Sequence, residues 1–313
     1  MAKKEEQEAL VTTRDGITLV VHSWKTEQPV CLLLCIQGLG GHGGYYDVLA
    51  EAPELAEVQV IAPDLRGHGR SQGRRGDIAS FRLYLEDVDS TVAWARRHWP
   101  ALPLILLGES MGASIAIHYL SSQLPHVREV SGLILISPVL SASITPRPSE
   151  VWRYLWLLLS APTRPAMPIT GREELGCRDA SFNERLRNDP LFVRLVSVRF
   201  LNLLSLWLGA ARRRAPALRL PLLLLRGSCD YIARERGTRA FLRRLASRDV
   251  EVVTFAGAYH SLLHDPATPA LLEAMQSWLQ RHLGGGPFPS AGEQQADNRP
   301  GQEAGFAPDR SSA

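Results

Sequence analysis

Short apolar runs that alternate with helical patterns limit the folds open to this chain of 313 residues. The runs are apolar at consecutive positions, as strands buried on both faces of a parallel sheet are. They cover residues 31–37, 58–63, 102–108, 131–137, 221–227 and 250–257. Helical segments such as residues 81–99 separate most of them, and residues 8–24 are predicted to form an opening hairpin that turns at Asp15-Gly16. This order predicts a doubly wound α/β sheet.

One stretch breaks the alternation. Residues 139–218 contain helical patterns but no strand, which predicts a helical cap inserted into the sheet domain. The core is then divided into residues 1–138 and 219–283. Residues 284–313 are rich in glycine, proline and small polar residues and have nothing to bury, so we expect a disordered tail.

The composition excludes several classes of protein. A hydrophobic share of 45% suits a large core, and a net charge of +3 is too small to indicate nucleic-acid binding. The cysteines, Cys31, Cys35, Cys177 and Cys229, have neither metal-ligand spacing nor the pattern of a disulfide framework. The N-terminus lacks an apolar leader, and the most apolar run, residues 154–162, is too short to span a bilayer. We expect a soluble cytoplasmic protein.

A serine stands at the junction between a predicted strand and a helix. Gly108, Ser110 and Gly112 match the pattern G-x-S-x-G, directly after an apolar run and directly before a helical pattern. This is the context of a nucleophile elbow, a tight turn that exposes the serine oxygen above a sheet. Side chains at the glycine positions would collide with the neighbouring strand and helix, whereas a serine that merely caps a helix would need neither glycine. Ser110 is therefore the candidate nucleophile.

A serine hydroxyl needs a base, and the base needs an acid that orients it. In this kind of fold the two follow the serine in the order acid, then histidine. Asp230 comes just after the run at 221–227, and His260 comes just after the run at 250–257. Open α/β sheets hold their chemistry at the carboxyl ends of their strands. The sequence therefore predicts a triad of Ser110, Asp230 and His260.

Other residues compete for these roles. His118 is expected to pack against the core two turns into the helix after the elbow, and His264 lies one turn into the last helical pattern. Glu235 is the one credible substitute for the acid, because Asp87 and Asp89 lie mid-helix and are expected to be solvated. We expect His260 and Asp230 to be better placed than any of these.

The glycine-rich stretch after residue 37 allows two interpretations. Gly38, Gly40 and Gly43 satisfy the dinucleotide fingerprint G-x-G-x-x-G, with Asp64 about 20 residues further on. Alternatively, the glycines let the backbone approach a substrate, so that the N–H of Leu39 serves as an oxyanion donor. We favour the second interpretation, in which the backbone N–H groups of Leu39 and Met111, the residue after the nucleophile, stabilise the tetrahedral intermediate.

The chain resembles the α/β-hydrolases, and within them the branch of monoacylglycerol lipases and lysophospholipases, which also contains serine aminopeptidase-like members. The resemblance covers roughly residues 8 to 283. The motifs that carry it are QGLGGHGGYYDVLA (37–50), DLRGHGRSQGRRG (64–76), GESMGA (108–113), GSCD (227–230) and AYHSLLHD (258–265). Family members typically show His-Gly where this chain has Gln37-Gly38, which bears on how the oxyanion loop packs.

The resemblance implies a mostly parallel sheet of eight strands with helices on both faces and an inserted cap. It implies hydrolysis of a carboxylic ester through an acyl-serine intermediate, without a cofactor or a metal, and it places the family's catalytic roles on Ser110, Asp230 and His260. Monoacylglycerols or lysophospholipids are the favoured substrates. Small esters and aminoacyl peptides stay open, as does a silent ligand receptor on the same fold. DLRGHGRS is expected only to shape a loop.

The predicted cap combines apolar and basic residues. Residues 154–159 are strongly apolar, with Arg153 before them, and Arg212–Arg214 stand near the end of the cap. Apolar side chains can bury in a membrane interface and arginines are attracted to anionic lipid, so we expect a peripheral membrane contact through the cap. The alternative is that leucines such as Leu157 and Leu158 pack inside the cap.

Overall fold

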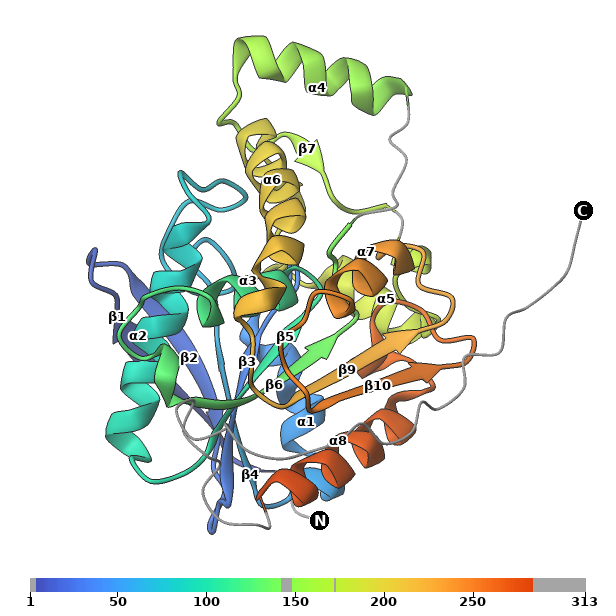
Figure 1. Ribbon diagram of the computed structural model, residues 1–313. Coiled ribbons are helices and arrows are strands. Elements are labelled where there is room, and N and C mark those ends of the chain that lie inside the picture. Colours follow the sequence, from blue (N-terminus) through green and yellow to red (C-terminus); the bar gives the residue numbers. More distant parts are fainter. Residues whose placement is uncertain (1–3, 142–147, 172, 284–313) are drawn as a thin grey trace, which may run out of the picture.

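The computed structural model describes residues 4–141, 148–171 and 173–283. Within these ranges the main sheet has eight strands in the order β1-β2-β4-β3-β5-β6-β9-β10 (Figure 1). Their bounds are β1 Glu6–Thr12, β2 Thr18–Trp24, β3 Cys31–Ile36, β4 Val58–Pro63, β5 Leu104–Glu109, β6 Val130–Ile136, β9 Leu222–Gly227 and β10 Val250–Phe255. The pairs β1–β2 and β2–β4 are antiparallel, and the other pairs are parallel. The predicted hairpin and the mostly parallel sheet are confirmed.

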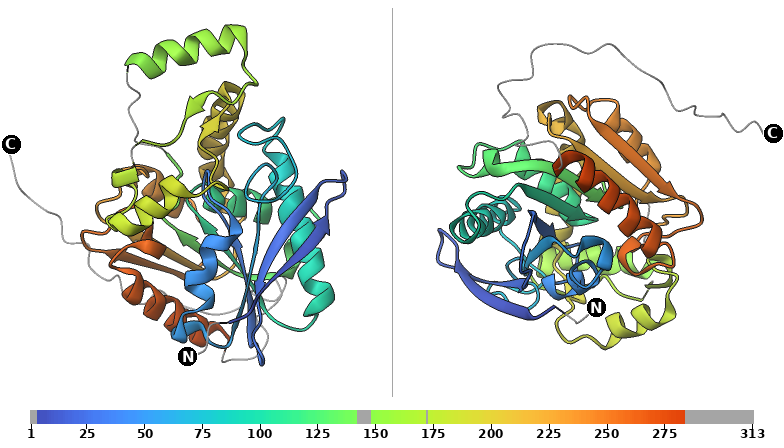
Figure 2. Two further views of the ribbon diagram at one scale, coloured as in Figure 1. Left: turned by 180° about the vertical axis from the view of Figure 1, so that it is seen from behind. Right: turned by 90° about the horizontal axis from the view of Figure 1, so that it is seen from below.

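Helices cover both faces of this sheet, as Figure 2 shows from below. Helices α2 (Arg82–His98) and α3 (Met111–Leu120) pack on one face, and α1 (Asp47–Ala50) and α8 (Thr268–Leu283) pack on the other. Alternate residues of β3 enter the two cores: Leu32 and Leu34 face α2 and α3, whereas Leu33 faces α1 and α8. The chain also contains α7 (Glu235–Leu242) and the 3₁₀ turns η1 Gly43–Tyr46, η2 Pro53–Leu55, η3 Val127–Glu129, η4 Glu173–Leu175, η5 Ala215–Ala217 and η6 Leu262–His264.

Strand β10 departs from the expected burial. It lies at the edge of the sheet, and Val250 and Val252 on one of its faces are exposed. An apolar run therefore does not guarantee a strand covered on both faces. None of the helices in the described ranges combines the length and the apolar composition needed to cross a membrane.

Two aspartates of α2 also correct a prediction, because both are buried rather than solvated. Asp87 accepts hydrogen bonds from the guanidinium and the backbone N–H of Arg66. Burial raises the pKa of Asp87 to about 6, and Arg66 opposes the rise. Asp89 accepts hydrogen bonds from the Tyr119 hydroxyl and from His126. Partners from distant segments are what allow these carboxylates to be buried.

Between β6 and β9 the described residues add no strand to the main sheet. This cap segment (residues 148–171 and 173–218) contains α4 (Pro148–Ser160), α5 (Ala180–Asn188) and α6 (Val198–Arg214). It also contains β7 (Met167–Pro168) and β8 (Leu195–Val196), which pair with each other. The prediction that this stretch holds no strand is therefore wrong. The cap boundaries at 139 and 218 stay predictions, and the predicted disordered tail at 284–313 lies outside the described residues.

Residues 75–77 attach the cap segment to the core. Gly76 accepts a backbone hydrogen bond from Ser197 at 2.7 Å. The buried Asp77 carboxylate accepts the Ser197 hydroxyl at 2.5 Å and pairs with the Arg199 guanidinium at 2.5 Å. The Arg75 guanidinium donates to the backbone oxygen of Leu191 at 2.6 Å. The DLRGHGRS motif is expected only to shape a loop. The loop that begins at residue 64 has a further role, because its end anchors the cap segment to the core.

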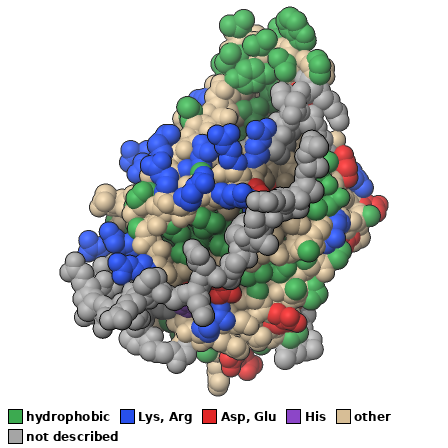
Figure 3. All heavy atoms as spheres, turned by 45° about the vertical axis from the view of Figure 1, so that its right-hand side comes forward, with side chains coloured by type: hydrophobic (Ala, Val, Ile, Leu, Met, Phe, Trp, Pro, Cys, Tyr) green, Lys and Arg blue, Asp and Glu red, His purple; other side chains and the backbone are tan. Residues whose placement is uncertain are grey.

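Helix α4 presents most of its apolar side chains to solvent. It stands at the top of the molecule in Figure 1, and hydrophobic side chains gather over it in Figure 3. Trp152, Trp156 and Leu159 are 75%, 63% and 89% exposed, whereas Leu157 is only 1% exposed and belongs to the main core. The helix thus turns one narrow face inward and the remainder outward.

We predict that truncating a side chain of α4 destabilises the protein on the inward face of the helix and has little effect on the outward face. Leu157→Ala should lower the free energy of unfolding by about 2–3 kcal/mol, because it leaves a cavity in the core. Leu159→Ala should change it by less than about 0.5 kcal/mol. Urea unfolding followed by circular dichroism measures both, and equal losses in the two variants would contradict this packing.

Candidate active site

Ser110 stands on a sharp turn between β5 and α3. Its backbone has φ 55° and ψ −113°, a left-handed conformation that residues with a side chain rarely adopt. Its N–H donates to Ile136 of β6 at 2.9 Å. A Cβ at Gly112 would overlap the carbonyl oxygen of Ile36, and one at Gly108 would lie 2.6 Å from the Cα of Ala113. The two glycines therefore allow strand and helix to meet closely enough to form the turn.

The structure brings Ser110, His260 and Asp230 together, although they come from three different strand ends. His260 Nε2 lies 2.8 Å from Ser110 Oγ. His260 Nδ1 lies 2.7 Å from Asp230 Oδ2. Because an ionised carboxylate only accepts hydrogen bonds, Nδ1 carries the ring proton, and Nε2 is left with a lone pair for the serine hydroxyl. The imidazole is therefore oriented to accept a proton from Ser110.

Asp230 is held in its ionised form. The backbone N–H groups of Ile232 and Ala233 donate to its Oδ1, each at 2.8 Å. Burial alone would raise the pKa of Asp230, but the hydrogen bond and charge of His260 and the two backbone donors lower it below its ordinary value. The carboxylate thus stays charged at neutral pH and holds the imidazole in one tautomer.

The structure places the rival residues elsewhere. The His264 ring stacks on Phe182 with a centroid distance of 3.7 Å, and the His118 ring stacks on Trp207 at 3.8 Å. Burial lowers the pKa of each histidine to about 4. Glu235, the first residue of α7, pairs with the Arg226 guanidinium at 2.8 Å. None of these groups occupies the position that His260 and Asp230 hold.

The predicted oxyanion donors lie beside the nucleophile. A Cβ at Gly38 would stand 3.2 Å from the Cβ of Ser110, so the loop before Leu39 packs directly on the serine. Met111 is the first residue of α3, where a backbone N–H has no partner within the helix. Neither Leu39 nor Met111 donates its N–H to another of the described residues. Both groups are therefore available to a ligand.

Asp64 does not have the freedom that a dinucleotide site would require. Its carboxylate is fully buried and accepts the backbone N–H of Gly43 at 2.7 Å and that of Arg70 at 2.8 Å. His22 Nε2 also lies 3.1 Å from it. An acid that binds a ribose must be free to accept hydrogen bonds from its hydroxyls, but both carboxylate oxygens of Asp64 already have partners within the protein. The glycine-rich stretch 38–43 instead packs on Ser110 through Gly38, where the interpretation as an oxyanion loop expects it.

One group of side chains has the composition of a metal site. The potential ligand atoms of His22, His42 and Asp64 lie within 4.8 Å of one another. Each ring nitrogen already has a protein partner, however: Glu6 and Asp64 for His22, and Gly44 and Asp189 for His42. These partners account for the cluster as a hydrogen-bond network, and we assign no metal to it.

Sequence reasoning missed a partly buried carboxyl next to Ser110. Glu109 Oε2 accepts the Tyr46 hydroxyl at 3.2 Å. Burial raises the pKa of Glu109, and the charge of His260 opposes the rise. The residue is the variable position of the G-x-S-x-G motif, so the motif itself carries no signal for it. The strand's alternation carries no signal either, because β5 is buried on both of its faces.

Comparisons with known proteins agree with this geometry. A family model described as serine aminopeptidase, S33, matches residues 27–267. Mouse monoglyceride lipase is 30% identical over 279 residues, which cover 86% of this chain and 89% of the mouse protein. Phospholipase YtpA of Bacillus subtilis is 28% identical over 263 residues, covering 83% of this chain and 99% of that protein.

A solved structure has the same fold. It is a soluble variant of monoglyceride lipase from Saccharomyces cerevisiae in complex with a substrate analogue, with a TM-score of 0.77 and 21% identity. The match covers 90% of this chain and 96% of the yeast chain. The predicted α/β-hydrolase fold is therefore confirmed.

The crowding at the elbow predicts opposite effects of two glycine substitutions. Gly112→Ala should lower the free energy of unfolding by about 2–3 kcal/mol or more, because the new methyl group has no room beside Ile36. The matched control is Gly209→Ala in α6, where no atom lies within 4 Å of the added group. It should stabilise the protein by up to about 1 kcal/mol through helix propensity. Thermal unfolding of both variants decides, and an unaffected Gly112→Ala would refute the steric argument.

Proposed function

Since the chain belongs to the serine aminopeptidase S33 family of α/β-hydrolases, we propose that it cleaves monoacylglycerols by an acyl-serine mechanism. Its relatives identify it as an ester hydrolase. The observation that carries the mechanism is the 2.8 Å contact between Ser110 Oγ and His260 Nε2, with the Asp230 carboxylate behind the imidazole. Ser110 is the proposed nucleophile, His260 the base and Asp230 the acid that orients it.

Acylation begins when His260 Nε2 takes the proton of the Ser110 hydroxyl as Oγ attacks the ester carbonyl. The carbonyl oxygen becomes an oxyanion, which the N–H groups of Leu39 and Met111 are proposed to bind; loss of one such donor costs roughly 3 to 4 kcal/mol. When the intermediate collapses, the bond to the alcohol breaks and His260 gives its proton to the leaving oxygen. The acyl group is then bound to Ser110 as an ester.

Deacylation repeats these steps with water. His260 Nε2 accepts a proton from the water as its oxygen attacks the acyl carbon, and the same backbone donors stabilise the second oxyanion. Collapse breaks the bond to Ser110 Oγ, which receives the proton from His260. The products are a carboxylic acid and the free enzyme, and each proton taken up by His260 is returned.

Relatives with defined substrates support the choice of substrate class. The mouse and yeast proteins are named as monoglyceride lipases, and the Bacillus subtilis protein is named as a phospholipase. Monoacylglycerol is therefore the first candidate, and a lysophospholipid is the second. Both consist of one acyl chain esterified to a polar head group, so the same triad can serve either.

Exposed apolar residues on α4 support a peripheral membrane contact. Trp152, Trp156 and Leu159 are exposed on α4, which stands at the top of the molecule in Figure 1, and Arg153 is exposed beside them. Such side chains can bury in a lipid interface, and a basic residue near anionic lipid adds about 1 kcal/mol. A lipid substrate would then be drawn from the surface on which the cap rests.

The expected role of Arg212–Arg214 in this contact needs correction. Tyr154 of α4 bonds to Asn202, near the first turn of α6, whereas the three arginines end that helix. At a rise of 1.5 Å per residue, ten residues of helix separate Asn202 from Arg212 by about 15 Å, more than a Debye length at physiological salt. The proposed membrane contact therefore rests on α4 and Arg153.

The catalytic assignment predicts that Ser110→Ala abolishes ester hydrolysis and leaves the fold intact. Loss of the nucleophile in a comparable triad costs about a millionfold in turnover. Ser121→Ala, at the end of α3, is the matched control and should keep wild-type activity. A fluorophosphonate probe should label the wild type and Ser121→Ala but not Ser110→Ala. A Ser110→Ala variant that kept a tenth of wild-type activity would show that the nucleophile lies elsewhere.

The same assays separate the substrate classes. We expect kcat/KM to be highest for long-chain monoacylglycerols, lower for lysophospholipids and short aryl esters, and lowest for aminoacyl amides. A preference for aminoacyl amides would make the protein an aminopeptidase. A wild-type protein that neither hydrolyses the panel nor reacts with the probe would be a silent ligand receptor.

The membrane contact predicts a loss confined to substrates in vesicles. Replacement of Trp156 and Leu159 by serine should reduce hydrolysis of monoacylglycerol in anionic vesicles by at least about tenfold, since each side chain contributes about 1.5–3 kcal/mol when buried. Leu10→Ser, at a similarly exposed leucine of β1, is the control. Thermal stability and hydrolysis of a short soluble ester should not change. An equal loss on both substrates would place these side chains in the substrate path or the core.

A further inference from the structure

The oxyanion loop (residues 37–46) is closed by one internal hydrogen bond and is held from the core by another. The Gln37 side-chain amide donates to the backbone oxygen of Gly41 at 2.7 Å, which closes the loop on itself. The backbone N–H of Gly43 donates to the buried Asp64 carboxylate. Gln37, where the family typically has histidine, thus has a structural use in this chain. The contact with Asp64 holds the loop from the side of the core.

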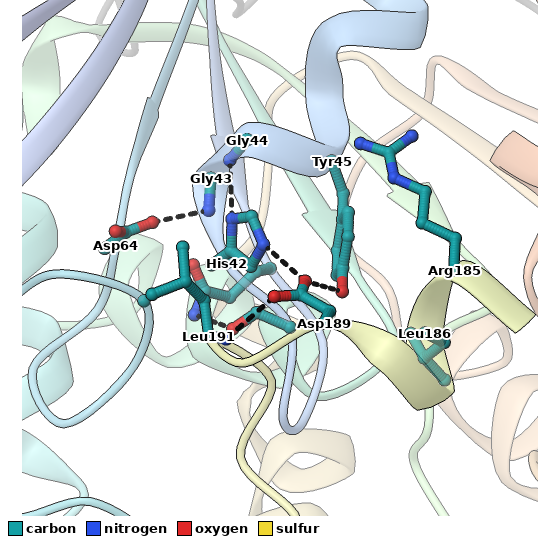
Figure 4. Close-up of polar contacts among 12 residues, drawn as sticks. His42, Gly43, Gly44, Tyr45, Asp64, Arg185, Leu186, Asp189 and Leu191 are labelled. Atoms are coloured by element: carbon teal, nitrogen blue, oxygen red, sulfur yellow. Dashed lines mark hydrogen bonds and ion pairs between the residues drawn. The ribbon is translucent and has the colours of Figure 1, made fainter. Parts of the chain in front are cut away.

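A carboxylate of the cap segment holds the same loop from the opposite side (Figure 4). Asp189, which ends α5, accepts hydrogen bonds from His42 Nε2 at 2.9 Å and from the Tyr45 hydroxyl, both at its Oδ2. Its Oδ1 accepts the backbone N–H of Leu191 at 2.7 Å. Three donors therefore converge on one carboxylate, and two of them belong to the oxyanion loop.

The hydrogen bonds determine the state of each partner. The Gly44 N–H donates to His42 Nδ1 at 3.1 Å, so Nδ1 has a lone pair and the ring proton is on Nε2, facing Asp189. Burial alone would raise the pKa of Asp189, but the bonds from Tyr45, Leu191 and His42 lower it below its ordinary value. Asp189 is therefore ionised at neutral pH. The His42 and Asp189 side chains are only 10% and 12% exposed, which shields the cluster from water.

A backbone contact adds to this attachment next to the predicted oxyanion donor. The N–H of Val193 donates to the backbone oxygen of Gly40 at 2.9 Å. A Cβ at Gly40 would lie 2.6 Å from the Phe192 ring, so the cap segment packs directly on the loop. On the other side, Gly38 packs on Ser110. Leu39 stands between these two contacts, and its N–H is positioned by both.

We propose that Asp189 is a positioning residue. From the cap segment it fixes the position of the oxyanion loop through its hydrogen bonds with His42 and Tyr45. The Leu39 N–H is thereby directed at the reacting oxygen. The inference rests on the proposed function, since it assigns a second task to the cap of the same enzyme. It follows that the cap controls the chemical step in addition to making the proposed membrane contact. A shift of α5 that breaks the Asp189 contacts slows hydrolysis of every ester, including esters too short to reach the cap.

The test compares Asp189→Ala, Asp189→Asn and Tyr45→Phe on a short soluble aryl ester. For Asp189→Ala we expect kcat to fall at least about tenfold with KM unchanged, since complete loss of an oxyanion donor costs about a hundredfold to a thousandfold and a displaced donor costs part of this. Asp189→Asn keeps one acceptor oxygen and should recover part of the loss. Tyr45→Phe should lose less than Asp189→Ala, and the double variant should be no worse than Asp189→Ala alone.

A second measurement isolates the oxyanion. An alkyl boronic acid forms a tetrahedral adduct with the serine and should bind Asp189→Ala more weakly by the factor lost in kcat/KM. The matched control is Asp179→Ala. Asp179 is the N-cap residue of α5, at the other end of this helix, where its side chain accepts the N–H groups of Ser181 and Phe182. It alters the stability of the same helix without touching the oxyanion loop, and its kcat should be that of the wild type.

Several outcomes would overturn the inference while wild-type activity and the Ser110 assignment stand. One is an unchanged kcat in folded Asp189→Ala. Others are a loss confined to KM for long-chain substrates, or an equal fall in kcat for Asp179→Ala. If Asp189→Ala does not fold, the test rests on Tyr45→Phe. In that variant an unchanged kcat together with unchanged boronic acid binding would also overturn the inference. Inactivity of the wild type would instead refute the proposed function itself.

Discussion

The backbone conformation of Ser110 is the constraint on which the rest of the site depends. A φ of 55° is unfavourable for serine, so the surrounding structure must impose it. Bonds to β6 hold the serine from the strand side, and Gly112 lets α3 start directly against Ile36. The same turn places Gly38 against Ser110. The proposed nucleophile, the helix terminus and the proposed oxyanion loop are thus brought together by one strained residue and its glycine neighbours.

The loop that follows β4 connects this turn to the rest of the molecule. Asp64 holds the oxyanion loop at Gly43, Arg66 pairs with Asp87 of α2, and Asp77 receives Arg199 of the cap segment. These charges are buried or partly buried, and each has an opposite charge or backbone donors, as burial requires. The sequence motif indicated a shaped loop and nothing more. These three contacts join residues that lie 21 to 122 positions apart, and no local spacing records such pairs.

The cap segment shows how much of its structure the periodicity of apolar residues can predict. The apolar pattern of α4 predicts a helix, and the helix is present. The pattern does not tell which leucine faces the core, because both faces of the helix are apolar. Contact with α6 and with the core buries Leu157 and leaves Leu159 exposed. Likewise, Arg212–Arg214 stand at the end of the cap in sequence, but the orientation of α6 carries them away from α4.

The sequence by itself indicated the strands of the parallel sheet, the tight turn at Ser110 and the places of Asp230 and His260 directly after strand ends. These depend on local signals: apolar runs, glycines two positions from a serine, and polar residues where strands end. Only the tertiary structure decided that Asp87 and Asp89 are buried, that Asp64 serves the protein and not a nucleotide, and that Asp189 meets His42 across 147 positions. A carboxylate can be buried only where donors surround it, and here those donors come from segments that the folded sheet and cap bring together.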